Sequence, residues 1–121
     1  MDKLSGNILL VDDDEAFRYA TTKILESAGF TVSAAPDHRE ALEILEGKSP
    51  VDLLVTDVIF PGQVHGLALA RMARMRRPGI KTLYLTGFDV PETEAEALGK
   101  VLRKPISNEQ LINEVRLALA G

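Results

Sequence analysis

Residues 7–20 have the sequence NILLVDDDEAFRYA, in which a short apolar run ends directly in three aspartates and a glutamate. Four consecutive acidic side chains repel one another, and a packed core does not stabilise them. Acidic residues are favoured in the first turn of a helix by the helix dipole, and this ordinary explanation suits Asp14 and Glu15. Asp12 and Asp13 stand closer to the apolar run, and we interpret them as acids held together by a positive charge.

Length and composition indicate which class of protein this chain belongs to. The chain has 121 residues, 45% of them hydrophobic and 26% charged, which is typical of a single globular domain, expected to span 1–121. It contains no cysteine, which excludes disulfides, thiolate metal sites and a cysteine nucleophile. The net charge of −4 argues against direct binding of nucleic acid. The sequence has no signal-peptide pattern and no apolar run of the roughly 20 residues that a bilayer span needs. We expect a cytoplasmic protein without membrane contact.

Short apolar runs alternate with amphipathic segments along the whole chain. The apolar runs are 8–11, 31–35, 52–56, 81–86 and 100–104. Apolar residues at helical spacing lie between them, within 16–28, 41–45, 67–75 and 111–119, and a weaker acidic candidate lies at 91–99. The central runs are continuously apolar, as in strands that are covered on both faces of a parallel sheet. The pattern predicts a doubly wound α/β fold, a five-stranded parallel sheet in the order 2-1-3-4-5 with helices on both faces.

Polar side chains follow the predicted strands at the points where the strands end. Parallel sheets bind ligands at the carboxyl ends of their strands, beside the point where the strand order reverses. The residues at this edge are Asp12 and Asp13 after the first strand, Asp57 after the third, Thr86 and Gly87 after the fourth, and Lys104 after the fifth. The topology therefore predicts three carboxylates, a hydroxyl and an ammonium group in one place.

This set of groups favours a particular chemistry. Carboxylates at close range share a cation or gain protons, and oxygen ligands alone favour Mg²⁺ or Mn²⁺. A carboxylate can also attack phosphorus and form an acyl phosphate. Mg²⁺ and Lys104 would neutralise charge during such a transfer, the Thr86 hydroxyl would donate to the phosphoryl group, and Gly87 would leave room for it.

The sequence resembles the receiver domain of two-component response regulators, which has a flavodoxin-like (CheY-like) fold. The matching segments are ILLVDDD (8–14), LLVTDVIFPG (53–62), LYLTG (83–87) and LRKP (102–105). The resemblance implies that Asp57 accepts a phosphoryl group from a histidine kinase, a phosphotransfer protein or a small donor. Asp12 and Asp13 would then hold Mg²⁺ together with the backbone carbonyl of Ile59.

The resemblance also implies how the signal is passed on. Thr86 and Lys104 would rearrange around the phosphoryl group, beside a cis peptide bond before Pro105. The face formed by the fourth helix, the fifth strand and the fifth helix would bind an output partner, with dimerisation on phosphorylation left open. Apart from its own phosphorylation and dephosphorylation, the domain would catalyse nothing. Relatives carry Tyr or Phe three residues before the lysine, as a switch side chain, whereas this chain has Val101.

Two alternatives remain at this stage. A pseudo-receiver would keep the acidic residues as a binding module without switching, and the absent aromatic at Val101 favours it slightly. A haloacid-dehalogenase-like phosphatase also uses an aspartate nucleophile and Mg²⁺ after its first strand. Its motif needs Thr or Val where this chain has Ala16, and the chain is short for that class.

Overall fold

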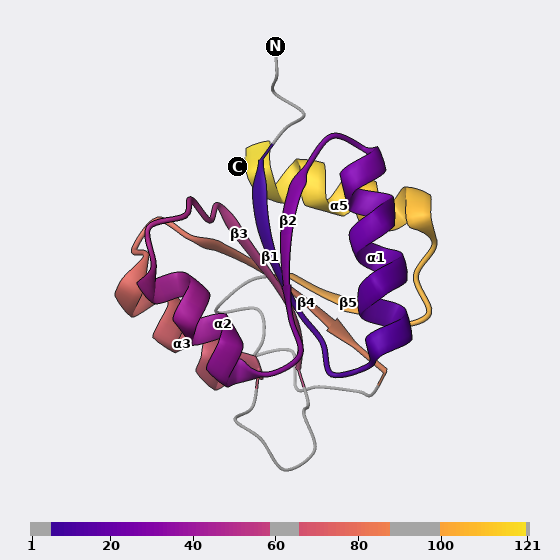
Figure 1. The fold of residues 1–121 in the computed structure, drawn as a ribbon. Helices are drawn as coiled ribbons and strands as arrows, with labels where there is room; N and C mark the ends of the chain where they lie inside the picture. Colours follow the sequence, from indigo (N-terminus) through magenta and orange to yellow (C-terminus); the bar gives the residue numbers. More distant parts are fainter. Residues whose placement is uncertain (1–5, 59–65, 88–99, 121) are drawn as a thin grey trace.

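The structure is a computed structural model that describes residues 6–58, 66–87 and 100–120. In these ranges five strands form one parallel sheet in the order β2-β1-β3-β4-β5, so the predicted fold class and strand order are confirmed (Figure 1). The strands are β1 (Asn7–Val11), β2 (Thr31–Ala35), β3 (Leu53–Asp57), β4 (Lys81–Thr86) and β5 (Lys100–Arg103).

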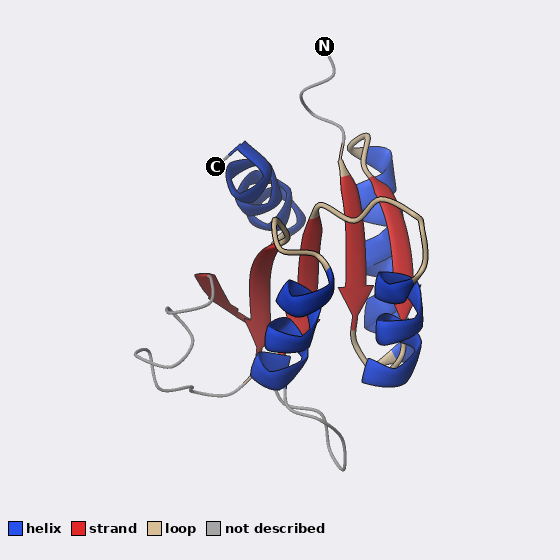
Figure 2. Ribbon diagram, turned by 90° about the vertical axis from the view of Figure 1, so that its left-hand side faces the viewer, coloured by secondary structure: helices blue, strands red, loops and turns tan. Residues whose placement is uncertain are grey.

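Helices cover both faces of the sheet (Figure 2). Those in the described residues are α1 (Glu15–Ser27), α2 (His38–Glu46), α3 (Gly66–Arg76) and α5 (Asn108–Ala120). Helices α1 and α5 enclose one apolar core against the sheet, which contains Leu25 and Val115. Helices α2 and α3 enclose a second core on the opposite face, which contains Leu45 and Ala70. The continuously apolar strands are buried because both of their faces are covered. The helical candidate at 91–99 lies outside the described residues.

Side-chain caps explain where the helices begin. The Asp14 carboxylate accepts a hydrogen bond from the Phe17 backbone N–H at 3.1 Å, so this acid is the N-cap of α1. Asp37 caps α2 in the same way, and the Ser107 hydroxyl accepts from the Gln110 N–H at 3.1 Å at the start of α5. The third consecutive aspartate thus has an ordinary structural role.

The apolar stripes of two helices differ from the sequence pattern. Met75 is the last residue of the apolar pattern at 67–75, which predicts that it faces the core, but its side chain is 80% exposed. The inward positions of α3 continue from Ala70 through Ala73, and Met75 is out of phase with them. Just beyond the helix Arg77 turns inward instead, and its guanidinium donates to the Leu45 carbonyl at 2.9 Å. In α1, Ala16 and Ala20 of the predicted stripe are exposed, whereas Thr21 and Leu25 are the buried residues.

Within the described residues, no helix is both long enough and apolar enough to cross a membrane.

Candidate functional site

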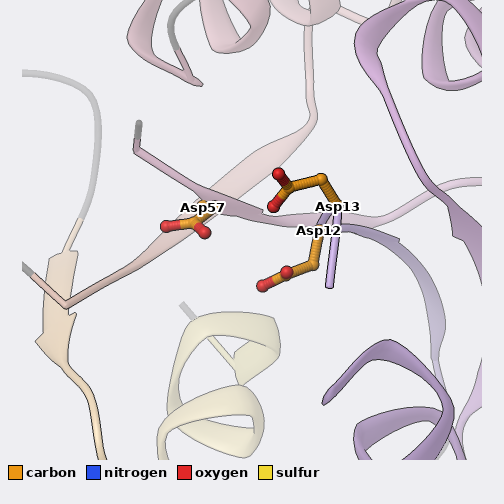
Figure 3. Close-up of side chains that lie close together, drawn as sticks. All are labelled: Asp12, Asp13 and Asp57. Atoms are coloured by element: carbon orange, nitrogen blue, oxygen red, sulfur yellow. The ribbon is translucent and has the colours of Figure 1, made fainter. Parts of the chain in front are cut away.

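Three aspartates meet at the carboxyl ends of the two central strands, β1 and β3 (Figure 3). Asp12, Asp13 and Asp57 each offer one carboxylate oxygen, and these oxygens lie within 4.8 Å of one another. Asp12 is buried, Asp57 is partly buried and Asp13 is exposed. The strand order brings these residues together although 44 positions separate Asp13 from Asp57 in the sequence (57 − 13).

Asp12 accepts hydrogen bonds from three other residues. Its carboxyl Oδ1 accepts from the Asp14 backbone N–H at 2.9 Å, and its Oδ2 accepts from the Lys104 ammonium at 3.0 Å. Its backbone carbonyl accepts from the Arg18 guanidinium at 2.8 Å, which ties α1 to the end of β1. The Asp12 side chain is only 1% exposed, so its charge is stabilised by these partners rather than by bulk water.

The Lys104 ammonium bridges two carboxylates. Its Nζ lies 3.0 Å from Asp12 Oδ2 and 3.3 Å from Asp57 Oδ2. The Lys104 backbone N–H donates to the Thr86 carbonyl at 2.7 Å, which continues the β4–β5 pairing past the end of the strand. The Nζ also lies 4.3 Å from the centre of the Phe17 ring, a contact that the sequence pattern did not reveal.

The Asp57 carboxylate is positioned by its own strand end. Its Oδ1 accepts from the Val58 backbone N–H at 3.0 Å. Burial raises the pKa of Asp57; the Asp12 charge raises it further, and the Lys104 ammonium opposes this without overcoming it. Burial alone would lower the pKa of Lys104, but hydrogen bonds and charge attraction from Asp12 and Asp57 outweigh it and raise that pKa. Three carboxylates lie together here, and the ammonium group among them contacts two of them, so a further cation would reduce their mutual repulsion.

A glycine contacts the backbone just after Asp57. The Gly66 N–H, at the start of α3, donates to the Val58 carbonyl at 2.7 Å. A Cβ atom on Gly66 would overlap the Asp57 carbonyl oxygen and lie 2.9 Å from the Val58 Cα. This position therefore requires the absence of a side chain. The sequence analysis did not single it out, because the contact joins segments that the chain pattern does not relate.

Of the remaining predicted site residues, the structure describes Thr86, Gly87, Val101 and Pro105. Thr86 is buried at the carboxyl end of β4, on the strand beside Asp57. Gly87 is exposed, and a Cβ there would meet no atom within 4 Å. The peptide bond between Lys104 and Pro105 is cis, as expected. Ile59, the predicted source of a carbonyl ligand, lies outside the described residues.

Val101 has an aromatic neighbour on the adjacent strand. It is partly buried and pairs in register with Tyr84 of β4, and both residues contribute to the core under α2 and α3. The Tyr84 ring is fully buried. The Thr82 side chain is close enough to the enclosed hydroxyl to lower the phenol pKa, but within the described residues no contact of this hydroxyl has the geometry of a hydrogen bond. Burial raises the pKa of the Tyr84 phenol. An aromatic ring is thus present in this core, contributed by β4 rather than by β5.

The variant Tyr84→Phe tests whether the buried Tyr84 hydroxyl contributes to stability. An unpartnered buried hydroxyl carries a desolvation penalty, so its removal is expected to leave the free energy of unfolding unchanged or to raise it by up to about 1 kcal/mol. Urea denaturation followed by circular dichroism measures this change. A loss of more than about 1 kcal/mol would show that the hydroxyl makes a stabilising bond.

Comparison with known proteins fits this geometry. A family model described as the response regulator receiver domain matches residues 8–116. The chain belongs to this family. It is a phosphoacceptor receiver domain of two-component signalling, as the sequence analysis predicted.

Individual relatives show how far the likeness extends. The chain is 36% identical to the response regulator receiver protein CpdR of Brucella abortus (strain 2308), over 93% of this chain and 95% of that protein. It is also 36% identical to the sensor kinase CckA of the same organism, over 93% of this chain but only 12% of that protein. The solved structure of the chemotaxis protein CheY4 of Vibrio cholerae superposes with a TM-score of 0.86 at 30% identity, covering 95% of this chain and 99% of that one.

Proposed function

We propose that Asp57 is the residue of this receiver that takes up the phosphoryl group. The observation that carries the proposal is the Lys104 ammonium, which contacts Asp57 Oδ2 and Asp12 Oδ2 in a cluster of three carboxylates. A carboxylate oxygen of Asp57 attacks phosphorus, and the bond from phosphorus to the donor breaks. The donor takes the electron pair, and an aspartyl phosphate remains. Lys104 supplies positive charge next to the transferred group.

The acidic cluster fits a hard divalent cation. Receiver domains generally bind Mg²⁺ in an acidic pocket, and the three oxygens here lie within 4.8 Å of one another. A cluster made of oxygen ligands suits this cation, which prefers carboxylate oxygens and water. Asp12, Asp13 and Asp57, together with the Ile59 carbonyl, would hold Mg²⁺ or Mn²⁺. The ion would offset the charge of the carboxylates and of the incoming phosphoryl oxygens.

The remaining roles follow from position and family. Thr86 and Gly87 border the site at the end of β4, where the Thr86 hydroxyl would donate to the phosphoryl group. The donor would be a histidine kinase, a phosphotransfer protein or a small acyl phosphate. The output partner would bind the face that includes β5 and α5. We place this exchange in the cytoplasm, where such donors occur, and propose that residues 1–121 form a single receiver domain with no other substrate.

Incubation with acetyl phosphate tests the proposal. Wild-type protein in Mg²⁺ is expected to gain one phosphoryl group by intact mass, and EDTA is expected to prevent the gain. Asp57→Asn is expected to gain none, because an amide cannot form the acyl phosphate. Asp52→Asn, which changes a carboxylate at the opposite end of the sheet, is the matched control and should be phosphorylated normally.

Two results would contradict the proposal. Equal phosphoryl uptake by Asp57→Asn would place the acceptor elsewhere. Mg²⁺ binding without any uptake in wild-type protein would favour the alternative of a binding module that no longer switches.

A further inference from the structure

Phe17, in the first turn of α1, contacts the Lys104 ammonium group through its side chain. Its backbone N–H donates to the Asp14 carboxylate at 3.1 Å, in the cap that starts the helix. Its side chain is partly buried and packs against the core that α1 and α5 share with the sheet. The ring centre lies 4.3 Å from the Lys104 Nζ, well within the range in which an aromatic face attracts an ammonium group.

The Lys104 side chain is flexible, so each contact of its ammonium group restricts where that group lies. A lysine side chain has four rotatable methylene groups, and an ammonium group can be satisfied in many positions. Two of its partners here are Asp12 and Asp57. The charge and shape of Asp57 change when it is phosphorylated, whereas the Phe17 ring is chemically the same before and after the reaction. The ring therefore offers Lys104 a constant partner.

A second contact between a lysine and an aromatic ring, formed within α1, serves for comparison. The Lys23 Nζ lies 5.3 Å from the centre of the Tyr19 ring. Both of these residues are outside the acidic cluster, and Tyr19 is exposed. Cation–aromatic contacts are weaker at such exposed sites, where water competes for the ammonium group. The pair Phe17–Lys104 differs because only 22% of the Lys104 side chain is exposed and its ammonium reaches the acceptor carboxylate.

We propose that Phe17 is a positioning residue for phosphoryl transfer, which holds the Lys104 ammonium beside Asp57. The inference rests on the proposed function of Asp57. It assigns to the first turn of α1 two tasks at the site: Arg18 fixes the Asp12 backbone, and Phe17 fixes the cation.

A double-mutant cycle tests the inference. The rate of phosphoryl uptake from acetyl phosphate in saturating Mg²⁺ is measured by intact mass for Phe17→Leu, Lys104→Met and the double variant. A contact worth about 0.5–2 kcal/mol predicts that Phe17→Leu slows uptake between about 2- and 30-fold. In the Lys104→Met background the same change is expected to have no further effect.

Control variants separate positioning from packing. Phe17→Tyr keeps an aromatic face and is expected to retain the wild-type rate. Tyr19→Leu removes the exposed aromatic of the same helix and is expected to leave the rate unchanged. Leucine conserves most of the apolar volume at position 17, and urea denaturation checks that the fold is kept. If Phe17→Leu is unfolded, Phe17→Met replaces it in the cycle.

Three outcomes would overturn the inference. The first is a wild-type rate in Phe17→Leu. The second is an equal slowing in the presence and absence of Lys104, which would indicate a purely structural role. The third is wild-type protein that takes up no phosphoryl group, which would overturn the proposed function as well. In the first two outcomes the assignment of Asp57 would stand.

Discussion

Lys104→Met is expected to slow phosphoryl uptake by about 100-fold, because it removes the ammonium group that lies beside the acceptor. The Nζ is 3.3 Å from Asp57 Oδ2 in a partly buried site, where a positive charge has more effect on developing negative charge than it has in water. Methionine keeps much of the length and apolar volume of the side chain. The rate of phosphoryl uptake from acetyl phosphate, followed by intact mass, measures the effect.

Lys100→Met provides the matched control. Lys100 is the first residue of β5, the strand that Lys104 directly follows, but its side chain is largely exposed and pairs with Glu114 at 3.1 Å. This surface ion pair is expected to contribute less than about 1 kcal/mol to stability and nothing to uptake. If Lys104→Met and Lys100→Met were phosphorylated at the same rate, the role of Lys104 in the transfer would be wrong.

Gly66→Ala is expected to have the second large effect, on both stability and uptake. The new Cβ would overlap the Asp57 carbonyl oxygen and press on the Val58 Cα at 2.9 Å. These are backbone atoms, which cannot rotate away as a side chain can. The free energy of unfolding should fall by roughly 3 kcal/mol, at the upper end of the usual range for overpacking. The backbone next to Asp57 must move to remove this overlap, so phosphoryl uptake should slow as well.

Gly79→Ala is the control for this change. A Cβ on Gly79 would meet no atom within 4 Å, and its stability should stay within about 0.5 kcal/mol of wild type. Urea denaturation of the two variants compares a crowded glycine with an uncrowded one. A Gly66→Ala protein as stable and as readily phosphorylated as Gly79→Ala would show that the start of α3 adjusts without strain.

The sheet and the position of the acidic cluster could be predicted from the sequence. The apolar runs are continuous, and their order along the chain alternates with helices, which restricts the topology to very few arrangements. Because parallel strands end at the same edge, Asp12, Asp57 and Lys104 could be placed near one another without coordinates. The structure shows that this reasoning holds for Asp57, which ends β3, and for Asp12 and Lys104, which directly follow β1 and β5.

Contacts between side chains of different elements could not be predicted in the same way. The Phe17 ring belongs to the apolar stripe of α1, and nothing in its spacing shows that its face meets Lys104. The sequence pattern assigns no role to Gly66, because its contact with Val58 depends on the path of the backbone. Met75 was assigned to the core because it is apolar, although the helical phase places it outward.

The pairing of β4 with β5 shows which aromatic residue lies next to Val101. Position 101 is paired with Tyr84, whose ring is already buried in the core that both residues share. The sequence contains this tyrosine within the segment LYLTG, but strand pairing was needed to relate it to Val101.

The central claim is that Asp57 carries the phosphoryl group, and its chemical trapping is the most direct test. Protein treated with acetyl phosphate in Mg²⁺ is reduced with borohydride, which converts a phosphorylated aspartate to homoserine, and the peptides are then sequenced by mass spectrometry. We predict homoserine at position 57 and unchanged aspartate at positions 12 and 13. Homoserine at either of those positions, or at none, would contradict the assignment.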